Sequence, residues 1–166
     1  MSATTQESKT AFSVVNEEPL LAHWQGHRNL TRKMIEAFPE KDFFEFSVGG
    51  MRPMAEMVME LIAIAGPGLQ EIIEPGSADF KESFEHQNKK ENILKKWDEQ
   101  TPVINELWEK LPKEKFEAEH TIFGEYKGTG LSHVFYFIDN EIHHRAQGYV
   151  YLRALGIQPP FFWERD

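Results

Sequence analysis

Three polar residues in apolar surroundings are the strongest candidates for chemistry in this chain: Glu60, Asn140 and His144. Glu60 shares a predicted helix face with Met57 and Ile64, so its carboxylate is expected to point toward the core. A buried carboxylate is costly unless it takes up a proton or finds a cationic partner. Asn140 and His144 are one helical turn apart, on the side of the last predicted helix that should face the core. We therefore predict that the three side chains meet inside the protein.

A carboxylate and one or two imidazoles from facing helices are a common way to hold a divalent metal in a helix bundle. Zn, Ni, Fe or Mn would suit such ligands, with open positions left for water or substrate. His27, on the core side of the first predicted helix, is a further candidate ligand; the alternative is a core histidine with one hydrogen bond. For Glu60, Asn140 and His144 the alternative is a buried hydrogen-bonded cluster that needs no metal.

Two neighbours on the last predicted helix are candidates for supporting roles. Gln147 lies near the same side as His144 and could orient a ligand side chain through a hydrogen bond. Arg145 is expected to bridge to a neighbouring helix through a carboxylate. Neither residue is predicted to bind a metal directly.

The helix that carries these residues is predicted to run from Thr129 to Gly156, because it contains no proline and ends at a glycine. Helical spacing places apolar residues on two nearly opposite faces, and two apolar faces imply burial on both sides. One face is expected to pack in the core and the other against a second subunit, which predicts a homodimer. The second face comprises Leu131, Phe135, Ile138, Ile142 and Tyr149.

The rest of the chain predicts an all-α four-helix bundle with a long crossover connection. Residues 1–12 are expected to be a flexible N-terminal tail, and residues 13–166 a single domain. Residues 112–130 are interpreted as a loop that crosses back to the last helix, and no strand pair is expected. The other helices are predicted at 19–39, from Pro53 to Gly66 or Pro67, and from Ala78 to about Gln100 with a shorter helix after Pro102.

Composition narrows the classes of function. At 40% apolar and 27% charged residues, the chain is typical of a soluble globular protein. A net charge of -9 argues against binding to nucleic acid, which depends on clustered Lys and Arg. The chain has no cysteine, which excludes disulfides and thiolate metal ligands and fits a cytoplasmic location. No apolar run suggests a secretory signal or a membrane-spanning helix.

The run NEIHHRAQGYVYLRALGIQPP, taken with GMRPMAEMVMELI, resembles the DinB/YfiT-like superfamily of four-helix-bundle proteins. In that family the last helix typically carries H-x-x-x-H-R-G-Q followed by LR-x-x-G and prolines, and the second helix carries a histidine. The resemblance implies a metal held by one residue of the second helix and a pair four residues apart on the last helix. The matching positions here are Glu60, Asn140 and His144, of which only His144 keeps the common histidine.

The resemblance also implies a class of activity, because family members include metal-dependent S-transferases and isomerases that act with small thiols. It predicts a small-molecule transferase or hydrolase in which the metal lowers the pKa of a bound thiol or water. The alternative is a catalytically silent dimeric bundle that acts in ligand binding or protein interaction. Sequence alone leaves open whether the protein is an enzyme.

Overall fold

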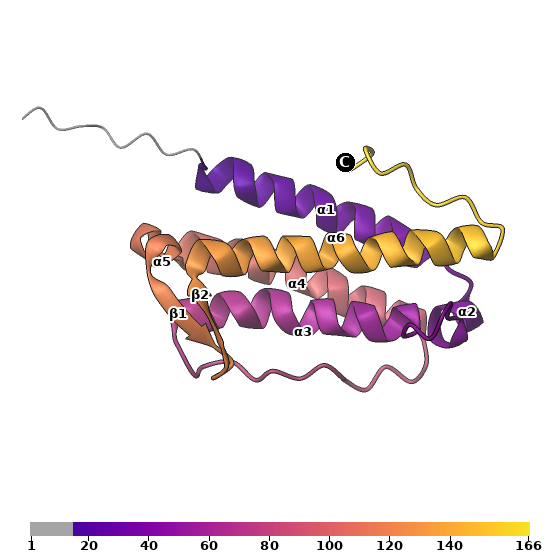
Figure 1. Ribbon diagram of the computed structural model, residues 1–166, viewed down its shortest axis with the longest axis horizontal. Coiled ribbons are helices and arrows are strands. Elements are labelled where there is room, and N and C mark those ends of the chain that lie inside the picture. Colours follow the sequence, from indigo (N-terminus) through magenta and orange to yellow (C-terminus); the bar gives the residue numbers. More distant parts are fainter. Residues whose placement is uncertain (1–14) are drawn as a thin grey trace, which may run out of the picture.

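The computed structural model describes residues 15–166, and the tail predicted for residues 1–12 lies outside the described part. Four long helices lie side by side along one axis, with two short helices and a small hairpin at the ends (Figure 1). The predicted all-α, four-helix-bundle fold is thereby confirmed. The elements are α1 (Glu17–Ala37), α2 (Glu40–Glu45), α3 (Met54–Ile73), α4 (Lys90–Lys110), α5 (Lys113–Glu117), β1 (Glu119–Ile122), β2 (Tyr126–Thr129) and α6 (Gly130–Ala154).

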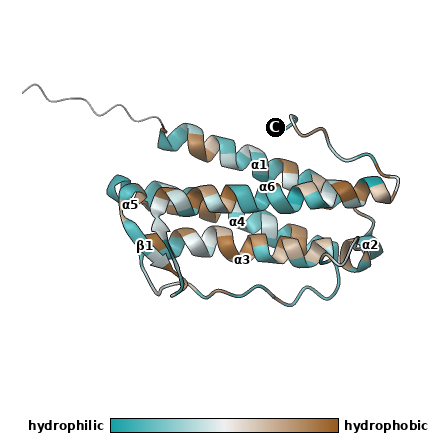
Figure 2. Ribbon diagram, in the orientation of Figure 1, coloured by the Kyte–Doolittle hydropathy of each residue, from teal (hydrophilic) through white to brown (hydrophobic). Residues whose placement is uncertain are grey.

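The core consists of two apolar clusters, one at each end of the bundle. One cluster contains Phe43, Trp97 and Tyr151, and the other contains Trp24 and Phe137. Hydrophilic residues cover the middle of α6, and α1 alternates between hydrophilic and apolar turns (Figure 2). The helices also bury polar side chains, among them His27, His144 and Arg145. Glu60 and Asn140 are half-buried.

Helix α3 continues through Pro67 to Ile73, although Gly66 or Pro67 was predicted to end it. Proline removes one hydrogen bond from a helix and usually breaks or kinks it. Beyond the proline, however, Leu69 and Ile72 are completely buried. Burying two such side chains contributes about 1.5–3 kcal/mol each, which is enough to offset the lost bond.

The helix predicted to begin at Ala78 begins instead at Lys90, as α4, and continues through Pro102. The residues between α3 and α4 run the length of the bundle as an extended connection (Figure 1). The buried carboxylate of Glu71 fixes the start of this connection, since it accepts hydrogen bonds from the backbone N–H groups of Gly76 and Ala78. The long crossover therefore precedes α4, rather than α6 as predicted.

The segment before α6, predicted as a loop, forms an antiparallel hairpin of β1 and β2. Phe123 and Gly124 at its turn both have positive φ, of 53° and 72°. Glycine adopts this conformation freely, whereas phenylalanine does so rarely. The sequence lacks the Asn-Gly or Asp-Gly pair that usually indicates a hairpin turn, and the turn was therefore not predicted. The side chain of Thr129 then caps α6 by accepting a hydrogen bond from the backbone of Ser132 at 3.1 Å.

Helix α6 packs closely on α1 and α3 at Gly148, where a Cβ atom would lie 2.7 Å from the sulfur of Met34 and 2.8 Å from that of Met54. On the second apolar face, which motivated the predicted dimer, Leu131, Ile138 and Ile142 pack into the core cluster that contains Trp24 of α1. Ile138 on that face is buried, and Phe135 is 40% exposed. The homodimer stays a prediction, with less exposed apolar surface to support it than the sequence pattern suggested. Within residues 15–166, no helix combines the length and the apolar character needed to cross a membrane.

Candidate functional site

The structure brings Glu60, Asn140 and His144 together between α3 and α6. The Oε1 atom of Glu60 accepts a hydrogen bond from Asn140 Nδ2 at 3.0 Å and lies 3.2 Å from His144 Nε2. The side chains of Glu60 and His144 are only 14% and 8% exposed. The polar atoms of a carboxylate, an amide and an imidazole thus meet at one largely buried position.

Arg52, which the sequence analysis missed, occupies the other oxygen of this carboxylate. Its guanidinium donates to Glu60 Oε2 in an ion pair. The Arg52 carbonyl accepts a hydrogen bond from the Tyr151 hydroxyl at 2.9 Å, which ties the loop before α3 to α6. A signal was present in the sequence, because Arg52 precedes the proline that starts α3 and lies two helical turns from Glu60.

His144 is held in a defined orientation by Gln147. Its Nδ1 atom lies 2.7 Å from Gln147 Oε1, and the Gln147 amide nitrogen in turn contacts the sulfur of Met51 at 3.4 Å. A ring nitrogen fixed in this way directs the opposite nitrogen, Nε2, toward Glu60. Gln147 therefore has the position that the sequence analysis assigned to an orienting residue.

Glu60 is ionised at any ordinary pH. The hydrogen bond from His144 lowers the pKa of Glu60 to about 2, and the hydrogen bonds from Asn140 and Arg52 act in the same direction against the opposing effect of burial. Both carboxylate oxygens have partners, and the negative charge is balanced by a guanidinium. The cluster is therefore satisfied as a hydrogen-bonded network.

A divalent metal is the group that the family resemblance implies for this position. Its usual protein ligands are carboxylates and imidazoles, of which Glu60 and His144 supply one each. Asn140 directs its N–H group, which has no lone pair to give, at the carboxylate. In the described part of the chain no three His, Cys, Asp or Glu side chains gather as metal ligands. As arranged, the donor set fits a hydrogen-bonded network better than a metal centre.

A cavity of about 420 Å³ opens beside Glu60, between α3, α6 and the hairpin. Among its polar residues, His133 is only 6% exposed, and its Nε2 atom has no hydrogen-bond partner in the described structure. Burial lowers the pKa of His133, so this ring is neutral at neutral pH. Aromatic rings form much of the remaining wall: Phe80, Phe123, Tyr126, Tyr136 and Phe137. The cavity is thus mostly apolar, with a small number of polar groups.

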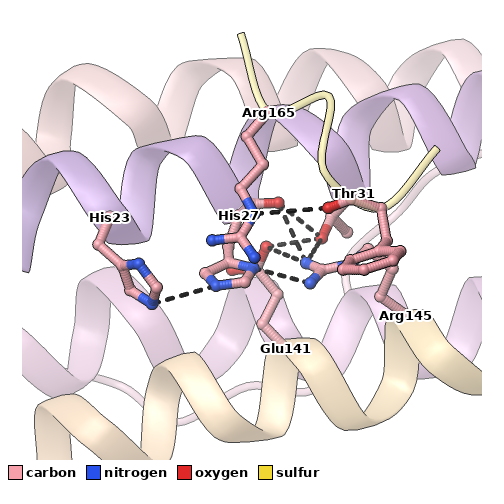
Figure 3. Close-up of polar contacts among 7 residues, drawn as sticks. His23, His27, Thr31, Glu141, Arg145 and Arg165 are labelled. Atoms are coloured by element: carbon pink, nitrogen blue, oxygen red, sulfur yellow. Dashed lines mark hydrogen bonds and ion pairs between the residues drawn. The ribbon is translucent and has the colours of Figure 1, made fainter. Parts of the chain in front are cut away.

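His27 does not join Glu60, Asn140 and His144. It lies on the α1 side of α6, where its Nδ1 atom is 2.7 Å from Arg145 Nη2 and its Nε2 atom is 3.1 Å from His23 Nε2 (Figure 3). The predicted link from Arg145 to a neighbouring helix exists, but it runs through His27 and Thr31.

The carboxylate nearest to Arg145 is that of Glu141, 3.6 Å away on the same helix. It also accepts a hydrogen bond from Thr31 at 2.6 Å. Arg145 therefore joins α6 to α1 within a second buried polar cluster, separate from the one around Glu60.

Comparison with known proteins identifies the family of the chain. Residues 1–165 match the DinB family. The chain belongs to this family. It is 26% identical over 151 residues to YjoA of Bacillus subtilis (strain 168), a protein named as uncharacterized, with 88% of this chain and 96% of YjoA covered.

Solved structures of DinB-like proteins share the bundle. One from Bacillus cereus ATCC 10987 aligns with a TM-score of 0.73 at 14% identity, covering 88% of this chain and 97% of its own. The structure of B. subtilis YjoA aligns with a TM-score of 0.70 at 22% identity, covering 89% and 99%. At these identities the likeness establishes the DinB fold, and the site must be interpreted from its own residues.

Proposed function

We propose that this DinB-family protein binds a small molecule in the cavity beside Glu60, and that the Glu60 carboxylate anchors it. The observation that carries the proposal is that one ionised, rigidly held carboxylate both centres the polar network and lines the cavity. Fixed polar groups in a mostly apolar pocket are the usual means by which proteins orient a ligand.

The lining indicates the class of ligand. A volume of about 420 Å³ suits a molecule of one or two rings. Aromatic walls favour a flat apolar body, and aromatic faces also attract cations. Glu60 and Glu82 line the cavity together with one lysine, Lys127. We infer a small molecule with an aromatic body and an amine or another hydrogen-bond donor directed at Glu60.

A divalent metal is the second candidate, supported by the way Gln147 orients His144. Metal-bound histidines usually have their other ring nitrogen fixed by a hydrogen bond, as Gln147 fixes Nδ1 of His144. The separation of 3.2 Å between Nε2 and Oε1 equals that of two ligands each about 2.1 Å from one ion. Glu60 and His144 would be its ligands. Asn140 would become a third ligand if its side-chain amide rotated so that Oδ1 faced the metal. Such a metal would activate a thiol or water for transfer or hydrolysis.

Calorimetric titration with tyramine, an aromatic amine, tests the first proposal. We expect saturable binding by the wild type and at least a tenfold loss in Glu60→Gln, which keeps the shape and removes the charge. Glu56→Gln is the matched control, since Glu56 is exposed one turn earlier on α3. Equal affinity in wild type and Glu60→Gln would refute the anchoring role.

Metal analysis of untagged protein tests the second candidate. Stoichiometric metal in the wild type that is absent from His144→Ala would support it. No bound metal, together with unchanged thermal stability when Zn or Ni is added, would count against it. A metal held by Glu60 and His144 would occupy the same carboxylate and repel the ammonium group of tyramine, so the tyramine titration is made on metal-free protein.

A further inference from the structure

A second hollow, of about 390 Å³, lies on the α1 side of α6. Its walls come from α1, from α6 and from residues 157–166, which turn back over α1 after α6 ends (Figure 1). Figure 3 shows Arg165 reaching from this C-terminal segment toward His27. The hollow does not include Glu60, Asn140 or His144.

Every charged side chain that lines this hollow is basic. Arg145 and Arg165 line it together with His23 and His27, and no Asp or Glu does so. This is unusual in a chain with a net charge of -9. The described residues give Arg165 no ion pair, and its hydrogen bond is a long one, 3.5 Å from Nε to the Phe162 carbonyl. Because Arg145 pairs with Glu141 at 3.6 Å, Arg165 is the arginine of the hollow that the described residues leave without an ion pair.

The two histidines are four residues apart on α1, a spacing that often marks a metal site, but their hydrogen bonds favour a different role. Arg145 donates to Nδ1 of His27, so that nitrogen carries no proton and the neutral ring must carry its proton on Nε2. That N–H group donates to His23 Nε2 at 3.1 Å. A protonated Nε2 cannot bind a metal, and two nearby guanidinium groups disfavour a cation further. The pair is therefore not arranged to bind a metal.

The remaining residues that line the hollow supply apolar surface and one hydrogen-bond donor. Ile142, Ala146 and Phe162 supply apolar surface. The hydroxyl of Tyr149 is buried without a hydrogen-bond partner in the described structure. Because burial raises the pKa of Tyr149, the hydroxyl keeps its proton and is available as a donor.

Contacts with α1 hold Arg165 in place before any ligand arrives. Its Cβ atom packs over Gly26, where an added Cβ would lie only 3.2 Å away. Asn29 donates to the Arg165 carbonyl at 3.3 Å, and Lys33 donates to the carbonyl of Glu164 at 3.2 Å. A residue whose backbone is fixed in advance loses less conformational entropy when it binds its ligand.

We propose that this hollow is a binding site for a small organic anion, in which a carboxylate or phosphate group meets Arg165 and Tyr149 while an apolar body packs against Phe162. The planar guanidinium can donate two parallel hydrogen bonds to such a group. The site is independent of the proposed function at Glu60, because it uses different residues and takes a ligand of opposite charge.

Calorimetric titration with benzoate, and separately with inorganic phosphate, tests the assignment. We expect benzoate to bind saturably and phosphate to bind at least tenfold more weakly, because it lacks the apolar body. Arg165→Gln should weaken benzoate binding by about 10-fold or more, as expected for the loss of a charge-assisted pair. Arg153→Gln is the matched control, since it makes the same change in net charge at an exposed arginine of α6.

Tyr149→Phe provides a second variant that removes only the hydroxyl, and it should weaken benzoate binding by about 3-fold or more. Thermal unfolding without ligand shows whether each variant is folded. Equal benzoate affinity in wild type and Arg165→Gln, or an equal loss in Arg153→Gln, would overturn the site. Absence of benzoate binding would also overturn it, and binding of phosphate alone would overturn the apolar half of the assignment.

Discussion

Replacing His27 with asparagine should make the stability of the protein less sensitive to mild acid. His27 is 3% exposed, and burial, with the charges of Arg145, Arg165 and His23, lowers its pKa from 6.5 to about 3. As the pH falls below 6.5, residue 27 becomes protonated in the unfolded chain but stays neutral in the folded chain. The folded state therefore loses stability throughout the window from pH 6.5 down to about pH 3.

The two pKa values fix the size of the effect. Between pH 7 and pH 5 the linkage relation gives a loss of about 2 kcal/mol for this one group. Asparagine cannot be protonated in this range, and its side-chain oxygen can replace Nδ1 as the acceptor for Arg145. The variant is expected to be less stable than the wild type at pH 7, because it loses the contact with His23 and some packing.

Urea unfolding at pH 7, 6 and 5 measures the effect. The difference in unfolding free energy between wild type and His27→Asn should shrink by about 2 kcal/mol over this range. Taking the difference cancels other groups that titrate in the same window, such as His133. His143→Asn, at an exposed position of α6, is the matched control. Parallel curves for wild type and His27→Asn would refute the assignment of a low pKa to His27.

Further predictions concern the other parts of the bundle. The ionised Glu60 carboxylate stabilises the fold above its unfolded pKa of 4.5, and this stability is lost as the pH falls toward 2. Acid titration followed by circular dichroism should show a loss of about 2 kcal/mol in unfolding free energy, after allowance for solvent screening. Glu60→Gln should not show this loss. Gly148→Ala forces a methyl group against the sulfurs of Met34 and Met54 and should lower the unfolding free energy by about 1–3 kcal/mol in urea, whereas an unchanged midpoint would mean that α6 is less tightly packed than described. Light scattering at micromolar concentration should give twice the monomer mass if the predicted dimer forms, and a mass near 19.3 kDa would contradict it.

The sequence predicted the bundle and the contact between Glu60 and His144, because both depend on helical periodicity and the spacing of the apolar residues shows this periodicity. The end of α3 was predicted wrongly, since Pro67 lies inside the helix, where the burial of Leu69 and Ile72 decides the outcome. The role of Arg52 could not be foreseen, because it depends on how the loop before α3 folds back onto Glu60.

His27 shows a different limit. Its burial was predicted correctly from its place on the core side of α1, and the alternative of a hydrogen-bonded core histidine describes it, but the sequence did not specify its partner. Whether it joined Glu60 or Arg145 depended on the rotation of α1 against α6, which a periodic pattern fixes only to within a fraction of a turn. The hollow beneath Arg165 could not be predicted either, because residues 157–166 have no periodic pattern that would place them on α1.

Neighbouring residues of α6 serve opposite sides of the bundle. Asn140 and His144 contact Glu60 of α3, whereas Glu141 and Arg145, each one residue further on, contact Thr31 of α1. A turn of this helix about its own axis would therefore disturb both sets of hydrogen bonds together. If an occupant of one hollow favours such a turn, the affinity at the other hollow must change by the same factor in both directions, because coupling between two binding events is reciprocal.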